Sequence, residues 1–213
     1  FGTARITDTT FLRNSAGGVG GGVYVLRAVN ITGTSFLSNT ASSNGGGAYL
    51  GGVANITATS FFSNTAGIGG GGMFVFNDAS ITGSNFFNNK AVTGDGGGAH
   101  VSYVASITGT NFLSNTAGVR GGGTYVGAAN FTGSGFLSNT AGSVGGAAYA
   151  SMASITGTTF LSNTALQQGG ALYLDGSSST PAWVVNSLFA RNRSLSNQGD
   201  ALYMQGSNPA SNL

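Results

Sequence analysis

This chain lacks most of the side chains that carry out chemistry in proteins. Its 213 residues contain no cysteine, one histidine and two prolines, and only 6% of them are charged. Glutamate is absent, so the five acidic residues are all aspartates. The absence of cysteine excludes a disulfide scaffold, and a single histidine without cysteine excludes the ordinary zinc sites. We therefore expect no metal site and no cofactor.

The few charges are spread singly along the chain. Seven lysine and arginine residues stand against five aspartates, which gives a formal net charge of +2 and a pI of about 9.2. Because no basic cluster forms, we do not expect a nucleic-acid partner. There is no run of about 18 apolar residues and no charged segment followed by an apolar one at the N-terminus, so we expect neither a membrane span nor a signal peptide.

Glycine is abundant, with 39 residues, and helix-forming glutamate is missing. A glycine-rich chain can be a flexible linker, but 40% of this chain is hydrophobic, and Phe and Ile recur at fixed spacing. Apolar side chains that recur in register indicate an ordered core. We therefore expect residues 1–213 to form one elongated domain.

A Phe-x-x-Asn motif recurs along the whole chain. Successive copies are 25, 25, 25, 26, 24, 24 and 29 residues apart. Repeats of this length are typical of solenoids, in which each unit buries its apolar face against its neighbours. The motif phenylalanines are Phe11, Phe36, Phe61, Phe86, Phe112, Phe136, Phe160 and Phe189.

The asparagines of this motif are the candidates for a structural ladder. We expect them to stack at one corner, where their amides would satisfy backbone groups left unpaired by a turn. They are Asn14, Asn39, Asn64, Asn89, Asn115, Asn139, Asn163 and Asn192.

Each repeat divides into three apolar segments, such as those of residues 48–50, 54–56 and 60–62. Alternate residues of the first two segments face inward if each is a β-strand. Four residues separate Ile56 from Phe61, so a bend must restore the inward parity, and we expect a left-handed residue two positions after the isoleucine. Only Ala58, among Gly, Asp and Asn equivalents, does not fit that expectation. The sequence predicts an all-β parallel β-helix (solenoid) of about eight coils of ~25 residues, with three short strands per coil.

The repeat resembles a known family. Gly-Gly-Ala-Leu at 169–172, Gly-Gly-Ala-Ala at 145–148 and Gly-Asp-Ala-Leu at 199–202 accompany the Phe-x-x-Asn motifs. This pair of motifs is similar to the polymorphic outer-membrane protein repeat, best known from chlamydial adhesins. The resemblance implies a right-handed parallel β-helix displayed at the cell surface, with a role in adhesion and no chemistry.

Enzyme chemistry has little support in the sequence. The aspartates lie in different repeats and mostly at different positions, so no pair for acid–base catalysis is expected. The single histidine, His100, falls in a column of aromatic residues, which favours a stacked ring over a general base. We expect no catalytic residue. The aspartates are Asp8, Asp78, Asp95, Asp175 and Asp200.

Two outward columns are candidate partner faces. The aromatic column could bind sugar rings or a partner, or its rings could simply stack on one another; its members are Tyr24, Tyr49, Phe74, His100, Tyr125, Tyr149, Tyr173 and Tyr203. The column after each motif phenylalanine could form an apolar interface, or it could tuck around a rounded corner. We call this second column the interface stripe, and it consists of Leu12, Leu37, Phe62, Phe87, Leu113, Leu137 and Leu161.

Two polar features complete the set of candidates. A Thr-x-Thr pattern, as at Thr32 and Thr34, resembles the arrays of ice-binding solenoids, although the predicted bend falls between its two columns. Acceptor sequences for N-glycosylation occur at Asn30, Asn55, Asn130 and Asn192. Glycans there would solubilise a surface that has few charges.

The sequence predicts a non-enzymatic, extracellular structural or adhesive module of a filament, sheath or cell-surface assembly. The alternatives are a carbohydrate-binding solenoid that uses the aromatic column and an ice-binding one that uses the Thr-x-Thr columns. Expected partners are copies of the chain, packed head to tail or laterally, other surface proteins, or a polysaccharide. Regular coils over 1–174 and an atypical last coil over 175–213 predict a segment of a longer protein or a fibre subunit.

Overall fold

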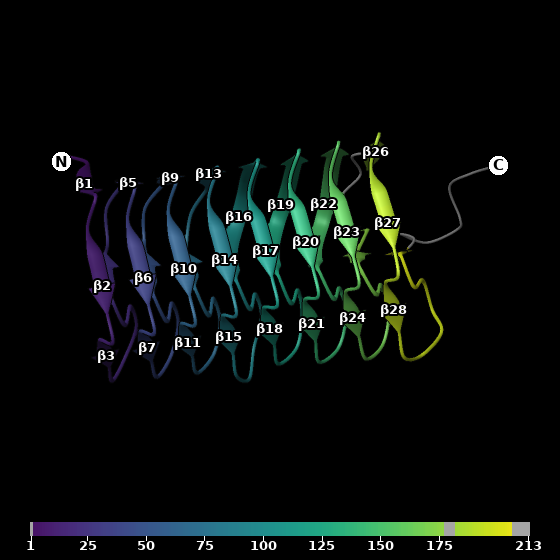
Figure 1. Ribbon diagram of the computed structural model, residues 1–213, viewed down its shortest axis with the longest axis horizontal. Coiled ribbons are helices and arrows are strands. Elements are labelled where there is room, and N and C mark those ends of the chain that lie inside the picture. The colour runs from purple at the N-terminus through teal and green to yellow at the C-terminus, as the bar shows by residue number, and fades with distance from the viewer. Residues whose placement is uncertain (1, 177–181, 206–213) are drawn as a thin grey trace.

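The computed structural model describes residues 2–176 and 182–205, which form a parallel β-solenoid of about seven turns (Figure 1). Within those ranges the elements are all β-strands. Each strand pairs in parallel with its equivalents in the neighbouring coils, so that three sheets run along the length of the molecule. The predicted all-β parallel solenoid is therefore confirmed.

Sheet B carries the motif phenylalanines and faces the viewer in Figure 1. Its three-residue strands place the phenylalanine inward and its two neighbours outward, as in the pattern of Ser35–Leu37. Phenylalanine pairs with phenylalanine at every step of the register. The strands are β2 (Thr10–Leu12), β6 (Ser35–Leu37), β10 (Ser60–Phe62), β14 (Asn85–Phe87), β17 (Asn111–Leu113), β20 (Gly135–Leu137), β23 (Thr159–Leu161) and β27 (Leu188–Ala190).

Sheet A lies behind sheet B and contains both of the other predicted segments (Figure 1). In three coils the two segments join into one long strand: β16 (Ala99–Thr108), β19 (Thr124–Thr132) and β22 (Ala148–Thr156). Elsewhere they remain separate, as β4 (Val23–Val25), β8 (Ala48–Leu50), β12 (Met73–Val75), β25 (Leu172–Leu174) and β29 (Leu202–Met204), and as β1 (Ala4–Thr7), β5 (Val29–Thr32), β9 (Ala54–Thr57), β13 (Ala79–Thr82) and β26 (Trp183–Val185).

Sheet C closes the triangle below the other two and was not anticipated from the sequence. Its strands are two residues long, mostly Thr-Ala, with the alanine buried. Three strand directions per coil are thus confirmed, but the third comes from this segment, because the first two predicted segments share sheet A. The strands are β3 (Ser15–Ala16), β7 (Thr40–Ala41), β11 (Thr65–Ala66), β15 (Lys90–Ala91), β18 (Thr116–Ala117), β21 (Thr140–Ala141), β24 (Thr164–Ala165) and β28 (Arg193–Ser194).

Stacked identical side chains fill the core. The phenylalanine rings from Phe11 to Phe189 stack along the axis with centroids 4.6 to 5.0 Å apart and nearly parallel planes. Isoleucines of sheet A, such as Ile56 and Ile81, are fully buried opposite them. Burial of one such side chain contributes about 1.5–3 kcal/mol, so that every coil adds a similar increment to stability.

Left-handed residues turn the chain at the corners of each coil. The predicted corner between sheets A and B is confirmed at every position, including Ala58 with φ of 48°. A second left-handed column, represented by Ser38 with φ of 54°, separates sheet B from sheet C. A third, represented by Gly45 with φ of 71°, precedes sheet A. These turns let short strands change direction by one corner without a long loop.

The glycine after the third corner is required by close packing between coils. A Cβ added at Gly46 would lie 2.3 Å from the carbonyl oxygen of Gly71 and 2.5 Å from the carbonyl carbon of Thr65. Both contacts are with backbone, which cannot rotate away as a side chain can. The Gly-Gly pair therefore brings sheet C and sheet A together at this corner.

The unequal repeat lengths are accommodated in part between the two segments of sheet A. The long strand of the fourth coil pairs with the next through a register shift between Val101 and Val104. In the last coil, Leu174 pairs with Ala150 and Val184 pairs with Ile155, so the additional residues lie between Leu174 and Trp183. Of the predicted atypical coil, residues 177–181 and 206–213 lie outside the described residues.

Candidate functional site

The asparagine ladder lies at the corner between sheets B and C. The Asn64 backbone N–H and Nδ2 each donate to Asn89 Oδ1 at 3.0 Å, and Nδ2 also donates to the Phe36 carbonyl oxygen at 2.9 Å. Asn64 is fully buried. The ladder holds neighbouring coils in register and leaves its amides unavailable to a ligand.

The same bonds link all eight asparagines of the predicted ladder. In the central coils, the Asn115 backbone N–H and Nδ2 donate to Asn139 Oδ1 at 3.0 Å, and both side chains are fully buried. Asn139 in turn donates to Asn163 Oδ1. The Nδ2 groups of Asn115 and Asn139 also reach back to the carbonyl oxygens of Phe86 and Phe112, each at 2.9 Å. The complete series is Asn14, Asn39, Asn64, Asn89, Asn115, Asn139, Asn163 and Asn192.

A second ladder of hydroxyl groups lies at the corner between sheets A and B. Thr59 is fully buried, its Oγ1 donates to the Thr57 carbonyl oxygen at 3.0 Å, and its backbone N–H donates to Ser84 Oγ. Thr34 is 1% exposed and makes the equivalent bond to Thr32. A flat lattice of two exposed threonine columns, which ice binding would need, is therefore not formed. The second threonine of each Thr-x-Thr pattern instead points into the corner, where its hydroxyl donates to a backbone carbonyl oxygen of the bend.

The aromatic column forms one continuous stack on sheet A. Ring centroids from Tyr24 to Tyr203 are 4.5 to 5.4 Å apart. Tyr24 is 51% exposed, whereas Tyr149 and Tyr173 are buried, and Tyr173 donates a hydrogen bond to Gln205. Each interior ring has both faces covered by its neighbours, so those faces cannot stack on a sugar.

An ion pair between Arg120 and Asp95 lies beside the aromatic column. Arg120 Nε and Nη2 donate to the two carboxylate oxygens of Asp95 at 3.0 and 2.7 Å. The Arg120 guanidinium carbon also lies 4.8 Å from the ring centroid of Tyr125 and 4.9 Å from that of Tyr149. The hydrogen bonds from Arg120 to Asp95 raise the pKa of Arg120 further above its ordinary value. This ion pair thus links the loops that precede the aromatic column to the Tyr125 and Tyr149 rings.

A second carboxylate, Asp175, lies at the C-terminal part of the stack. The Tyr149 hydroxyl donates to Asp175 Oδ2 at 2.6 Å, and the Ser151 hydroxyl lies 3.4 Å from the same oxygen. Burial and this hydrogen bond raise the pKa of Tyr149. Tyr149 is therefore held protonated as a donor, which is a structural role.

His100 sits between Phe74 and Tyr125, with each ring centroid 4.5 Å away. Its Nδ1 is buried without a hydrogen-bond partner among the described residues. Burial lowers the pKa of His100 to about 4, with Asp95 opposing and Arg120 reinforcing that effect. At neutral pH this ring is uncharged, as its place in an aromatic stack requires.

The candidate glycosylation positions divide into two kinds. Asn30, Asn55 and Asn130 point outward from sheet A, and Asn55 Nδ2 donates to Asn30 Oδ1 at 2.9 Å. Asn192 instead belongs to the ladder, because its Nδ2 donates to the Phe160 carbonyl oxygen and its Oδ1 accepts two bonds from Asn163. A glycan on Asn192 would break those contacts.

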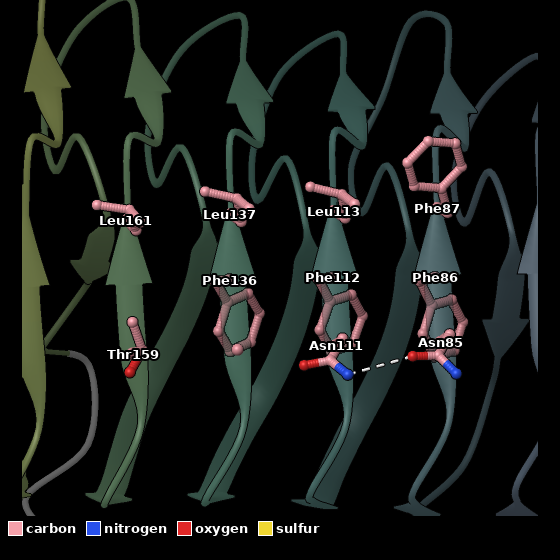
Figure 2. Close-up of a pocket in the computed structure, with 11 residues that line it drawn as sticks. Asn85, Phe86, Phe87, Asn111, Phe112, Leu113, Phe136, Leu137, Thr159 and Leu161 are labelled. Carbon is pink, nitrogen blue, oxygen red and sulfur yellow. Dashed lines mark hydrogen bonds between the residues drawn. The ribbon is translucent and has the colours of Figure 1, made fainter.

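The interface stripe runs along the outer face of sheet B. Leu12 is 54% exposed, Phe62 44% and Leu137 38%, and the Phe62 and Phe87 rings stack at 4.9 Å. Beside the stripe runs the column that precedes each motif phenylalanine, and the two columns form the walls of a groove of about 440 Å³ (Figure 2). Figure 2 shows Phe87, Leu113, Leu137 and Leu161 on one wall and the polar side chains on the other.

The polar wall was not identified from the sequence. It consists of Asn85, Asn111 and Thr159, with Gly135 between the last two. Asn111 Nδ2 donates to Asn85 Oδ1 at 3.2 Å. Gly135 has no side chain to continue this ladder, and a Cβ placed there would lie 2.8 Å from Asn111 Oδ1. That carbonyl oxygen therefore points into the notch above Gly135, on the side of strand β20 (Figure 2).

Other classes of site are not found in the described part of the chain. Within residues 2–176 and 182–205, no three His, Cys, Asp or Glu side chains are grouped so that they could hold a metal ion. The same ranges contain no helix of the length and hydrophobicity that would cross a bilayer. Among the hollows of the described surface, we take the groove on sheet B as the candidate binding site, because its lining continues over four neighbouring strands.

One repeat of the chain matches a known family model. The model of the Chlamydia polymorphic membrane protein repeat matches residues 157–175. The matched segment begins at the corner glycine Gly157 and contains Phe160, Asn163 and the Gly-Gly-Ala-Leu sequence. No curated protein and no solved structure matches this chain. The chain thus carries a repeat of this kind in a parallel β-solenoid with which that repeat is consistent.

Proposed function

We propose that this chain is a non-enzymatic, extracellular structural or adhesive module displayed at a cell surface, and that it makes contact through the outer face of sheet B. The match to a polymorphic membrane protein repeat and the β-solenoid fold support a surface-type module. The solenoid supplies a long face whose side chains repeat in fixed register, which suits extended contact with a partner.

The exposed interface stripe is the observation that carries this proposal. Its apolar side chains continue from coil to coil, with Leu12, Phe62 and Leu137 each more than a third exposed. A contiguous apolar face of this kind on a protein surface marks a place of interaction. By contrast, the sheet A strands that lead into the corner with sheet B carry Asn, Ser and Thr at their outward positions, such as Ser80 and Thr82 on β13. That part of sheet A is therefore polar.

The placement of the ionisable groups supports a non-enzymatic role. Asp95 is paired with Arg120, Asp175 accepts from Tyr149, and Asp200 accepts from the backbone N–H of Ser194. His100 is held neutral inside the aromatic stack. Asp95, Arg120 and His100 lie beside one another along the aromatic column, and their ion pair and ring contacts join neighbouring coils. These structural contacts account for the three groups without a catalytic role.

An adhesion assay with matched leucine variants tests the contact face. Beads coated with the purified chain would be scored for clustering with one another and for attachment to layers of cells or polysaccharide. Leu113→Ser/Leu137→Ser should abolish whichever attachment the native chain shows. Leu26→Ser/Leu166→Ser changes two leucines that are 68% and 48% exposed away from sheet B, and should leave it intact. Equal attachment by both variants, or none by the native chain, would contradict the proposal.

A further inference from the structure

The groove on sheet B has the size of a small-ligand site and not that of a protein interface. Its volume of about 440 Å³ falls within the usual range of ligand pockets, roughly 300–1,000 Å³. It is lined by 11 residues. A stable protein–protein interface needs about 20–30 residues on each side, so the groove by itself is too small for one.

The lining of the groove is uncharged. None of the 11 lining residues is ionisable, and they combine asparagine and threonine side chains with phenylalanine and leucine. A charged ligand would find no counter-charge on either wall of this groove. The lining therefore selects a neutral ligand.

One wall of the groove is apolar and the other is polar, so the groove suits a ligand with one apolar face and one polar edge. Phe87 and the three leucines offer apolar contact, while Asn111 Oδ1 offers an acceptor in the notch above Gly135 and Thr159 offers a hydroxyl (Figure 2). A sugar ring has an apolar face of C–H groups and an edge of hydroxyls that donate and accept hydrogen bonds. A plain hydrocarbon would leave the asparagine and threonine groups unsatisfied.

The groove also repeats along the solenoid axis. It crosses strands β14, β17, β20 and β23, which present equivalent positions at steps of ~4.8 Å. A linear polymer with a unit of similar length can place one unit over each strand and repeat the same contacts. We infer that this groove binds a neutral polysaccharide chain laid along the axis of the solenoid, a ligand class that rests on the adhesive function proposed above.

This site differs from the aromatic column of sheet A. There the ring faces are consumed by stacking between coils, whereas on sheet B the apolar side chains leave a groove beside them. Phe87 contacts Phe62 through one face, and the groove lies on its other side toward Leu113.

Calorimetric titration with defined oligosaccharides tests the inference. The probes are cello-, xylo-, manno- and malto-oligosaccharides of increasing length, with oligogalacturonates as an anionic comparison. At least one neutral series should bind, with affinity rising until the oligosaccharide spans about four units, one per strand, and then levelling. Absence of binding by every neutral series, or equally tight binding of oligogalacturonates, would overturn the inference.

A pair of asparagine insertions locates the site. Gly135→Asn fills the notch, and it displaces only the mobile end of Asn111. Ser60→Asn places an asparagine in the same column, on strand β10 outside the groove. The first should weaken binding by about tenfold or more, which corresponds to at least ~1.4 kcal/mol, and the second should leave it unchanged. Equal binding by both would show that the ligand lies elsewhere and overturn the assignment.

A second variant guards against an effect of folding. Phe87→Leu gives strand β14 the side chain that Leu113 supplies in the next coil, and should weaken binding several-fold with an unchanged circular dichroism spectrum.

Failure of the glycan inference is distinguishable from failure of the adhesive function. If coated beads still attach through Leu113 and Leu137 while no neutral oligosaccharide binds, the contact face stands and its partner is a protein or a second copy of the chain.

Discussion

The Asn64 side chain donates from Nδ2 to Asn89 Oδ1 at 3.0 Å, and this bond joins two consecutive coils inside a fully buried corner. Asn64 Oδ1 in turn accepts from the backbone N–H and Nδ2 of Asn39 at 2.9 and 3.0 Å. Its Nδ2 also donates to the Phe36 carbonyl oxygen. One amide therefore satisfies buried groups on both neighbouring turns.

Asn64→Ala should destabilise the chain by about 3 kcal/mol, because in a buried corner it removes the acceptor of the Asn39 backbone N–H, one of the two acceptors of Asn39 Nδ2, and the donor to the Phe36 carbonyl oxygen. Urea unfolding followed by circular dichroism measures the change. Asn55→Ala removes an exposed amide with a single side-chain bond, to Asn30, and should change the free energy of unfolding by less than ~0.5 kcal/mol. Similar losses for the two variants would show that the ladder contributes little.

The stability of the chain should fall as the pH drops from 6.5 to 4 because of His100. Burial lowers the folded-state pKa of this ring to about 4 from its ordinary 6.5, so the unfolded chain binds a proton first. The contribution of neutral His100 to the free energy of unfolding is complete above pH 6.5 and is lost as the pH falls through the folded-state pKa, with a total loss of roughly 3 kcal/mol. Phe74 and Tyr125 stack on the ring, and Asp95 and Arg120 are the charged groups that act on it.

His100→Phe supplies the matched comparison, because it restores the ring type found one coil earlier at Phe74. Its unfolding free energy should depend less on pH between 6.5 and 4 than that of the native chain. His100→Phe removes no other ionisable side chain, so the difference between the two curves reports the effect of His100. Parallel curves would mean that His100 can be protonated without cost in the folded chain.

Gly46→Ala should destabilise the chain by about 3 kcal/mol or more, since the added methyl group would meet backbone atoms at 2.3 to 2.5 Å. Gly18→Ala is the control, because a Cβ there has nothing within 4 Å and should be neutral or stabilise by up to ~1 kcal/mol. Thermal unfolding of the two variants tests this. A tolerated Gly46→Ala would mean that sheets A and C can move apart at this corner.

Periodicity made most of the fold predictable. Phe36, Ile56 and Asn64 stand in columns of nearly constant spacing, and side chains of fixed spacing in a solenoid must fall into the same column. The left-handed corner was also readable, because Gly33, Gly83 and their equivalents are residue types that tolerate positive φ. Ala58 adopts the same conformation because its neighbouring coils on both sides impose it.

What could not be predicted depended on contacts between neighbouring coils. Sheet C has two residues per strand, such as Thr65–Ala66, which is too short to show an alternating pattern. The pairing of Arg120 with Asp95 joins loops of unequal length in adjacent coils. The notch in the polar wall of the groove arises because Gly135 lacks a side chain between Asn111 and Thr159, and this becomes visible only once the register places these residues side by side.

The matching register of the coils has a consequence for how such a molecule can change. The contacts between Phe36 and Phe61 are nearly the same as those between Phe61 and Phe86, as are those of the accompanying asparagines. Deleting or duplicating the 25 residues from one motif to the next would rebuild the same neighbours on both sides. Recombination between such coding segments can therefore lengthen or shorten the rod in whole units without inventing a new interior.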